Sequence, residues 1–399
     1  RHRWPDSWKG MYDPVCPMEL ALYGHPESGA YWEEHCDSKL QSIGYTPIQE
    51  WPGCYFHSEL RVMAIVYVDD FQLSGPKDSL PKAWKLIREH IRLQEDPGPL
   101  GMFLGCQRRY FEIEHPDAPN GLIRGIEYDM ENQLQSAVDL YYDLYGQDSP
   151  LKTVVTPFRS GKQNIIGAPV TEGPWLRCPW CLGEFDERAF VRGIGDPDHD
   201  KATKADLKLL EEKLVADPKF ARLGEKAMRL LMKMLYAARI ARSDLQRAIN
   251  TLGACIHKWS DDCQDDLKRL MDFVFTSLGD RQYAWVGNWV HDIAPHLYAD
   301  ADFASDYKHT KSHNGVQLCL KGTMTFMPLS GISKKQDAIS HSTPEAEIVA
   351  AAFAVRREAL PSSLLWELLL VDPAASVPRS DKAENGYVWT IFHEDNQTM

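Results

Sequence analysis

The sequence has 399 residues, of which 44% are hydrophobic and 25% are charged. This length and composition predict a globular protein of two or three domains. No run of roughly 18 apolar residues is present that could span a membrane, and no signal peptide is recognisable. Nine scattered cysteines, an odd number, favour a reducing, intracellular compartment over a disulfide framework.

The net charge of −13 is unfavourable for nucleic-acid binding, because lysine and arginine normally neutralise the phosphates. The charge is unevenly distributed, however: residues 201–250 hold twelve Lys and Arg against six Asp and Glu. Bound metal ions would also offset part of the acidic excess. The chain begins with Arg1 instead of Met, which predicts a fragment or a processed product. The overall charge therefore does not exclude a nucleic-acid enzyme.

The first 60 residues predict one amphipathic helix. Residues 1–20 are rich in Trp and Pro and predict irregular structure, and the segment ALYG…SGAYW follows, ending at Trp32. From there Trp32, Cys36, Leu40 and Ile43 recur at helical spacing, and Gly44 can end the helix.

The stretch Val62–Gly75 predicts a β-hairpin with two carboxylates at its tip. Seven residues that are apolar, apart from the Tyr67 hydroxyl, precede Asp69 and Asp70, and Phe71-Gln72-Leu73 resumes the apolar pattern. Adjacent carboxylates repel each other, and a hard divalent cation such as Mg²⁺ relieves that repulsion. The alternative is an acidic surface turn, since Asp is a favoured turn residue. The hairpin alone does not decide between the two.

Helix, strand and helix follow the hairpin. Residues 83–91 have a helical apolar face, with Asp78 or Ser79 as cap and Pro81 in the first turn. Residues 98–105 (GPLGMFLG) predict a strand and turn. A second amphipathic helix contains Leu134 and Tyr141, in a segment that ends at Thr156-Pro157.

The middle of the chain is less informative. Cys178 and Cys181 form half of a zinc knuckle, but no second cysteine pair accompanies them, so we expect a loop with two free thiols and no stoichiometric zinc. Residues 201–214 predict a surface helix, and residues 226–290 are predicted to be helical, with an ordinary core stripe that includes Leu245 and Ile249.

The last hundred residues predict strands and a helix that carry carboxylates. Asp300 and Asp302 end one strand, and a turn and a second strand follow from Lys311. Thr343 can cap a helix that contains Glu345 in its first turn, with Pro344 at its first position. A final strand from 387 to 392 leads to Asp395.

These motifs together resemble the copia-type retrotransposon Pol polyprotein. Tyr67-Val68-Asp69-Asp70 is similar to the family's reverse-transcriptase hairpin, and ALYG…SGAYW and GPLGMFLG resemble flanking polymerase segments. In the ALYG…SGAYW segment, His25-Pro26-Glu27-Ser28 departs from the family pattern. The C-terminal motifs ADADF, KSHNG, SKKQ, STPEAE and DNQ resemble the ribonuclease H pattern in the family's order.

The resemblance implies an α+β fold: a partial reverse-transcriptase palm, a helical connection and a ribonuclease H-like mixed-sheet α/β domain. It implies the following segments: 1–115 palm without its first catalytic motif, 116–160 linker or thumb-like, 161–225 insertion of unknown role, 226–290 helical connection, 291–399 ribonuclease H-like. Both catalytic sites are expected to lack a carboxylate beyond the chain's ends, so we expect no nucleotide addition and weak hybrid cleavage.

The implied function is RNA-directed DNA polymerase and RNA/DNA-hybrid ribonuclease activity by two-metal phosphoryl transfer with Mg²⁺, or Mn²⁺ as a substitute. The implied catalytic and metal-binding residues are Asp69, Asp70, Asp300, Glu345 and Asp395. The implied partners are an RNA template, a DNA primer, their hybrid and dNTPs, without a membrane. The expected location is a cytoplasmic particle with a nuclear stage. The alternative is a decayed or domesticated remnant that binds nucleic acid or protein without catalysis.

Overall fold

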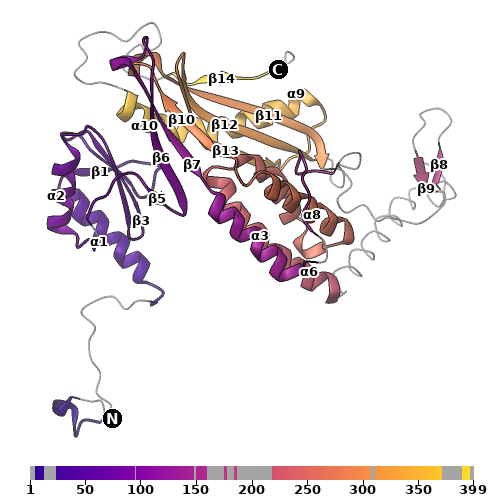
Figure 1. The fold of residues 1–399 in the computed structure, drawn as a ribbon, viewed down its shortest axis with the longest axis horizontal. Coiled ribbons are helices and arrows are strands. Elements are labelled where there is room, and N and C mark those ends of the chain that lie inside the picture. Colours follow the sequence, from indigo (N-terminus) through magenta and orange to yellow (C-terminus); the bar gives the residue numbers. More distant parts are fainter. Residues whose placement is uncertain are drawn as a thin grey trace. The chain divides into compact units, whose positions relative to one another are not determined.

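The computed structural model describes residues 5–12, 24–94, 96–147, 150–159, 175–177, 184–186, 218–306, 311–370 and 389–395. The chain divides into two compact units, Arg1–Pro99 and Leu100–Met399 (Figure 1). Within the described part of the chain, no helix combines the length and the apolar content that a membrane span needs.

The first unit is a four-stranded antiparallel sheet with two helices. Its strands pair in the order β1-β2-β3-β4. Their bounds are β1 Tyr45–Pro47, β2 Cys54–His57, β3 Val62–Tyr67 and β4 Asp70–Ser74, and the helices are α1 Ser28–Ser42 and α2 Leu80–His90 after a short 3₁₀ turn at Asp6–Trp8. Cys36 and Leu40 of α1, Ala64 of β3 and Ile87 of α2 share one buried core. The apolar periodicity of each segment therefore folds both helices against the hairpin that carries Asp69 and Asp70.

The second unit contains an eight-stranded sheet, in the order β14-β11-β12-β13-β10-β7-β6-β5. The strands are β5 Met102–Phe103, β6 Cys106–Glu114, β7 Leu122–Asp129, β10 Gln282–Val286, β11 Ala294–Asp306, β12 Lys311–Gly322, β13 Thr325–Lys335 and β14 Ile391–His393. Strands β11, β12 and β13 form an antiparallel ladder, with a register shift between Asp302 and Asp306 in the first pair and between Leu318 and Cys319 in the second. Strand β14 pairs with β11 in parallel, with His296 opposite Ile391. The two halves of the sheet meet at one pair, Trp285 opposite Phe326.

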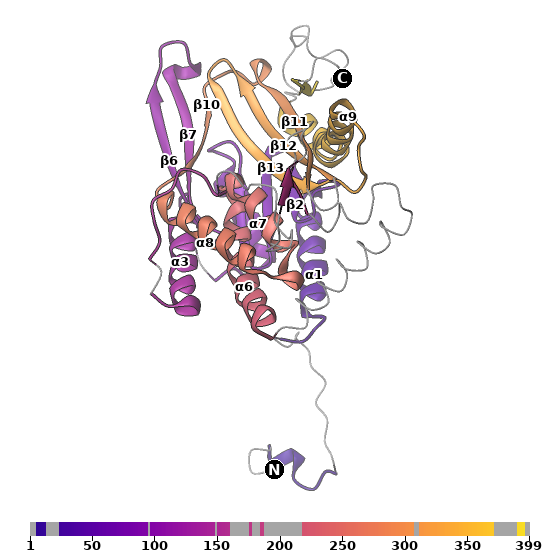
Figure 2. The same cartoon turned by 90° about the vertical axis from the view of Figure 1, so that its right-hand side faces the viewer.

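Helices of the second unit form two groups. One group is α3 Glu131–Tyr145, α6 Pro218–Ile240, α7 Gln246–Gly253 and α8 Asp261–Thr276, which share a large apolar core (Figure 2). The other is α9 Thr343–Ala354, a π-helical turn Val355–Ala359 and α10 Leu360–Leu370. Short 3₁₀ turns lie at Pro119–Gly121, Ser243–Leu245, Ile256–Lys258 and Val290–Asp292, and a small hairpin pairs β8 Trp175–Arg177 with β9 Glu184–Asp186.

The structure confirms the mixed α and β class and several predicted elements. The hairpin, the helix from Trp32 and the helical region after residue 226 are all present, although that region ends in β10. The segment expected to extend to residue 115 is divided: the first unit ends at Pro99, and β5 and β6 join the second unit's sheet. Pairing of β6 with β7 and of β7 with β10 explains this, because it couples residues 106–129 to the later sheet. Cys178, Cys181 and the predicted helix 201–214 lie outside the described residues.

Candidate functional site

The tip of the β3–β4 hairpin is a two-residue turn. Tyr67 pairs with Asp70, so only Val68 and Asp69 connect the strands. The side chains of Asp69 and Asp70 are both exposed. Val68 has a φ of 55°, a left-handed conformation that β-branched residues seldom adopt. Two-residue hairpin turns require a positive φ at their first central residue, so the turn imposes backbone strain on Val68.

Trp32 of α1 holds this turn from outside the hairpin. Its indole N–H donates to the backbone carbonyl of Val68, the residue with the strained φ. Trp32 is the last residue of the ALYG…SGAYW segment, so a motif recognised in the sequence contacts the carboxylate turn directly. The contact lies within the first unit.

A second group of carboxylates lines an open pocket of about 850 Å³ in the second unit. Asp300 and Asp302 come from β11, and Glu394 and Asp395 follow β14. The parallel pairing of β14 with β11 explains why they meet: His393, the last residue of β14, lies opposite Tyr298, so the residues after β14 come beside the next residues of β11. Of the residues predicted from sequence, the pocket thus brings together Asp300 and Asp395.

The carboxyl group of Asp300 is affected by its acidic neighbours. Burial raises its pKa above the usual value, and the nearby charges of Asp395 and Asp302 raise it further. Arg247 of α7 donates to Asp302 over 3.0 Å and so neutralises one charge of the pocket. The remaining repulsion favours a cation near Asp300 and Asp395.

The structure places Glu345, the residue predicted on α9, at the start of the helix. Glu345 is turned toward its own helix end: its carboxylate accepts from the backbone N–H of His341 over 2.7 Å, and its own N–H donates to Ser342 Oγ. Ser342, not Thr343, is the N-cap. Glu347, two residues on, is 4% exposed, and its pKa is raised to about 7 by burial and by Glu394 and Asp300. The charge of Asp300 therefore reaches the carboxyl group of Glu347.

A sequence signal could have separated the two glutamates. Ser342-Thr343-Pro344-Glu345 has the S-x-x-E spacing of a capping box, which uses the glutamate to satisfy backbone N–H groups at the helix start. Ala346 and Ala350, which flank Glu347 along the helix, pack on Ala301 of β11. The helix face that bears Glu347 is thus turned to the sheet, and the capping glutamate is not.

Gln336 fixes α9 to the sheet. Its side-chain amide donates to Asn314 Oδ1 over 2.7 Å and to the carbonyl of Ala346 over 2.9 Å, and it is 2% exposed. Gln336 ends the SKKQ motif and Asn314 belongs to KSHNG, so these two motifs have a structural role: they hold the start of α9, and with it Glu347, against β12.

The donor set partly suits a divalent metal ion. Carboxylate oxygens are the ligands that Mg²⁺ prefers, and Glu347 Oε2 is buried with no hydrogen-bond partner among the described atoms. Within the described residues, however, no three His, Cys, Asp or Glu side chains are grouped so that they could hold an ion. Alternation along β11 explains the gap, because Ala301 faces α9 and Asp300 therefore faces away from it.

Comparison with known proteins gives one partial similarity. Over 106 residues the chain is 33% identical to a retrovirus-related Pol polyprotein from transposon RE2 of Arabidopsis thaliana. The match covers 27% of this chain and 7% of that polyprotein, so the chain spans a small part of its relative's length. No family model and no solved structure matches the chain. Part of this protein is therefore similar to a retrotransposon Pol polyprotein.

Proposed function

We propose that the chain is the reverse-transcriptase and ribonuclease H part of a copia-type retrotransposon Pol polyprotein. The observation that carries the proposal is that Asp300 and Asp395 line one pocket at the β11–β14 pair, and that the charges of both residues raise the pKa of Glu347 on α9. These three residues come from a strand, a helix and a later strand, separated by more than forty positions each. The similarity to a Pol polyprotein supports the same origin.

The arrangement of the second unit's sheet agrees with a ribonuclease H-like domain. Three antiparallel strands, β11 to β13, are followed by α9 and then by β14, which lies parallel to β11. Helix α9 packs on β11 through Ala346 and Ala350. This order of elements is the one that brings the end of β14 beside the carboxylates of β11.

The chemistry proposed for the pocket is hydrolysis of the RNA strand of an RNA/DNA hybrid. Asp300, Glu347 and Asp395 would hold Mg²⁺, which supplies an activated water and stabilises the leaving oxygen. The pKa of Glu347 is raised to about 7, so near neutral pH its carboxyl group can exchange a proton for a cation, and the pKa of Asp300 is shifted in the same direction. Asp302 orients Arg247 at the rim, where a cationic side chain can meet a phosphate.

For the first unit we propose a polymerase role. Asp69 and Asp70 are consecutive, exposed and held on a strained turn by Trp32. This arrangement suits two carboxylates that bind Mg²⁺ together with a nucleoside triphosphate. The partners would be an RNA template, a DNA primer and dNTPs. The place of action would be a cytoplasmic particle with a nuclear stage.

Hybrid cleavage by the purified chain tests the proposal. A hybrid with end-labelled RNA is incubated with Mg²⁺ or Mn²⁺, and we expect cleavage that Asp300→Asn abolishes and Asp69→Asn leaves unchanged. An RNA duplex of the same sequence is the control substrate and should stay intact. Cleavage that survives Asp300→Asn would contradict the assignment of the pocket.

A second candidate is a non-catalytic module that binds nucleic acid or protein. It is favoured by the lack, within the described residues, of a group of three side chains ready to hold a metal ion. The same assay separates the two: hybrid binding without cleavage in either metal would support the second candidate and overturn the first.

A further inference from the structure

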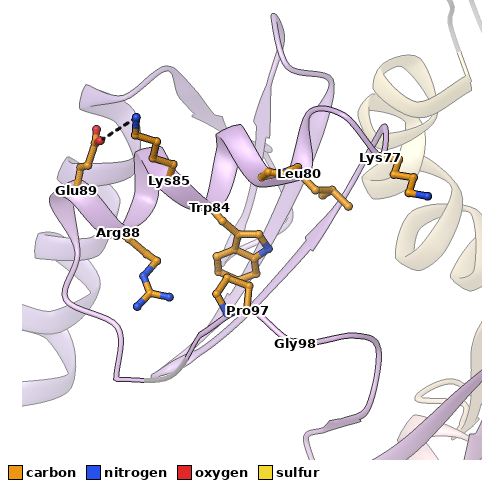
Figure 3. Close-up of a pocket in the computed structure, with 9 residues that line it drawn as sticks. Lys77, Leu80, Trp84, Lys85, Arg88, Glu89, Pro97 and Gly98 are labelled. Atoms are coloured by element: carbon orange, nitrogen blue, oxygen red, sulfur yellow. Dashed lines mark ion pairs between the residues drawn. The ribbon is translucent and has the colours of Figure 1, made fainter.

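Helix α2 of the first unit borders an open pocket of about 680 Å³ that has no place in the chemistry above. Lys77, just before the helix, and Leu80, Trp84 and Arg88 on it follow one another at intervals of three and four residues. These intervals place them along one face of a helix. Figure 3 shows Trp84 and Arg88 projecting to the same side, with Pro97 beside the indole. The face thus has an apolar, aromatic centre and a cation at each end.

The segment is basic within an acidic chain. Residues 77–92 hold five Lys and Arg against two Asp and Glu, whereas the whole chain has a net charge of −13. Trp84 is half-buried, and excess positive charge around an aromatic ring is characteristic of surfaces that bind single-stranded nucleic acid.

Both cations near Trp84 contact carboxylates that a phosphate could replace. Arg88 pairs with Asp96, whose side chain is 90% exposed. Lys85 lies 4.0 Å from Glu89, an exposed pair along the helix. Exposed ion pairs contribute little net free energy, so an incoming phosphate can compete for either cation. The contact with Asp96 also shows that Arg88 is already oriented toward an anion.

We propose that this pocket binds one strand of single-stranded RNA or DNA, with a base stacked on Trp84 and flanking phosphates on Arg88 and Lys85. From Leu80 to Arg88 the helix rises about 12 Å, which is room for a short run of nucleotides. This inference rests on the proposed function, because a polymerase fragment must hold a strand outside its catalytic carboxylates. The proposed site lies in the first unit and shares no residue with either group of carboxylates.

Fluorescence anisotropy with a labelled oligo(dT) and oligo(rU) tests the site on the full chain. We expect Trp84→Ala to weaken binding about 5- to 100-fold and Trp84→Phe to restore much of it, since stacking on an aromatic ring is the lost contact. Lys85→Ala should reduce the slope of log affinity against log salt by about 0.7, the share of one phosphate contact on a single strand. Asp96→Asn should tighten binding about two- to fivefold, because it removes a competing carboxylate.

Lys82→Ala is the matched control, since Lys82 is exposed on the same helix but does not line the pocket. It should leave both affinity and salt slope unchanged. Equal effects of Lys82→Ala and Lys85→Ala, or an unchanged affinity in Trp84→Ala, would overturn the site. Competition by poly-glutamate as effective as by unlabelled oligonucleotide would also overturn it, in favour of an acidic protein partner.

Hybrid cleavage measured on the same variants distinguishes this inference from the proposed function. If wild type cleaves the hybrid but the pocket variants bind oligonucleotide normally, only the pocket assignment fails. If wild type neither cleaves the hybrid nor binds any oligonucleotide, both fail.

Discussion

The two carboxylate groups of this protein are built in opposite ways. Asp69 and Asp70 are neighbours on one hairpin, exposed to solvent, and their geometry follows from the pairing of Tyr67 with Asp70. Asp300, Glu347 and Asp395 come from three elements, and their approach depends on the β11–β14 pairing and on the packing of α9.

The difference has electrostatic consequences. In the second unit, burial and like charges raise the pKa of Asp300, and they raise that of Glu347 to about 7. At the hairpin, the folded state is instead destabilised by backbone strain, in the left-handed φ of Val68. A site made of consecutive residues stores strain in its backbone, and a site made of distant residues stores it in charge repulsion.

The largest expected effect is on hybrid cleavage, and it differs between two glutamates of α9. Glu347→Gln should lower hybrid cleavage about 100-fold or more, because it removes a carboxylate that is proposed to hold Mg²⁺. Glu345→Gln is the matched control and should keep nearly full activity, since Glu345 caps its helix. Initial cleavage rates under single-turnover conditions measure both. Equal losses of cleavage rate in the two variants would contradict the different roles given to Glu345 and Glu347.

The pH dependence of stability should reveal the same charge repulsion. A glutamate carboxyl ordinarily titrates with a pKa of 4.5, and in the folded chain the pKa of Glu347 is raised to about 7. The folded state therefore holds a proton that the unfolded state loses, and this stabilisation is full below pH 4.5 and is lost as pH rises through 7. We expect a decrease of about 1–2 kcal/mol in the free energy of unfolding across this window, after allowance for solvent screening.

Urea unfolding at several pH values, with EDTA present, measures this decrease. Glu347→Gln should flatten the profile, and Glu345→Gln should not. Asp300 contributes in the same direction because its pKa is also raised. A wild-type stability that increases across the window would contradict the inferred repulsion.

In the first unit, the expected change is a smaller, local one. Trp32→Phe keeps an aromatic ring but removes the N–H donated to the Val68 carbonyl. Loss of one hydrogen bond should destabilise the hairpin by about 1 kcal/mol. Hydrogen exchange of the β3 and β4 amides measures it, with Trp289→Phe, at an exposed tryptophan of the other unit, as control. Unchanged exchange in Trp32→Phe would show that the contact does not hold the turn.

The smallest expected effect is a gain in stability. Val68→Gly should stabilise the chain by roughly 0.5–1 kcal/mol, because relief of the left-handed φ exceeds the entropy that glycine adds to the unfolded state. Thermal unfolding measures the gain. If the strain serves to position Asp69, Val68→Gly should not improve primer extension, measured in a longer chain that has this activity. A loss of stability in Val68→Gly would mean that the turn is not strained.

Local pattern was enough to predict most elements. The run Val62–Tyr67, the turn residues after it and the helical spacing from Trp32 to Ile43 each specify their structure within a short window, and the structure has them. The same holds for the mixed α and β class. The position of Asp395 just after a strand was also readable, whereas the prediction that Asp300 ends its strand was wrong: Asp300 pairs with Gly315 inside β11, which continues to Asp306.

Tertiary structure decided which residues meet. The sequence indicated Glu345, and only the docking of Ala346 and Ala350 on β11 showed that Glu347 lies on the buried side of α9, where the charge of Asp300 affects its pKa. It also gave no sign that β6 and β7 would extend the later sheet, because strand pairing across more than 150 residues leaves no local pattern. Sequence by itself determined where carboxylates stand along their own elements, because a side chain's face depends on its neighbours three or four residues away. The fold determined which of them repel one another, because electrostatic energy depends on distances that only packing sets.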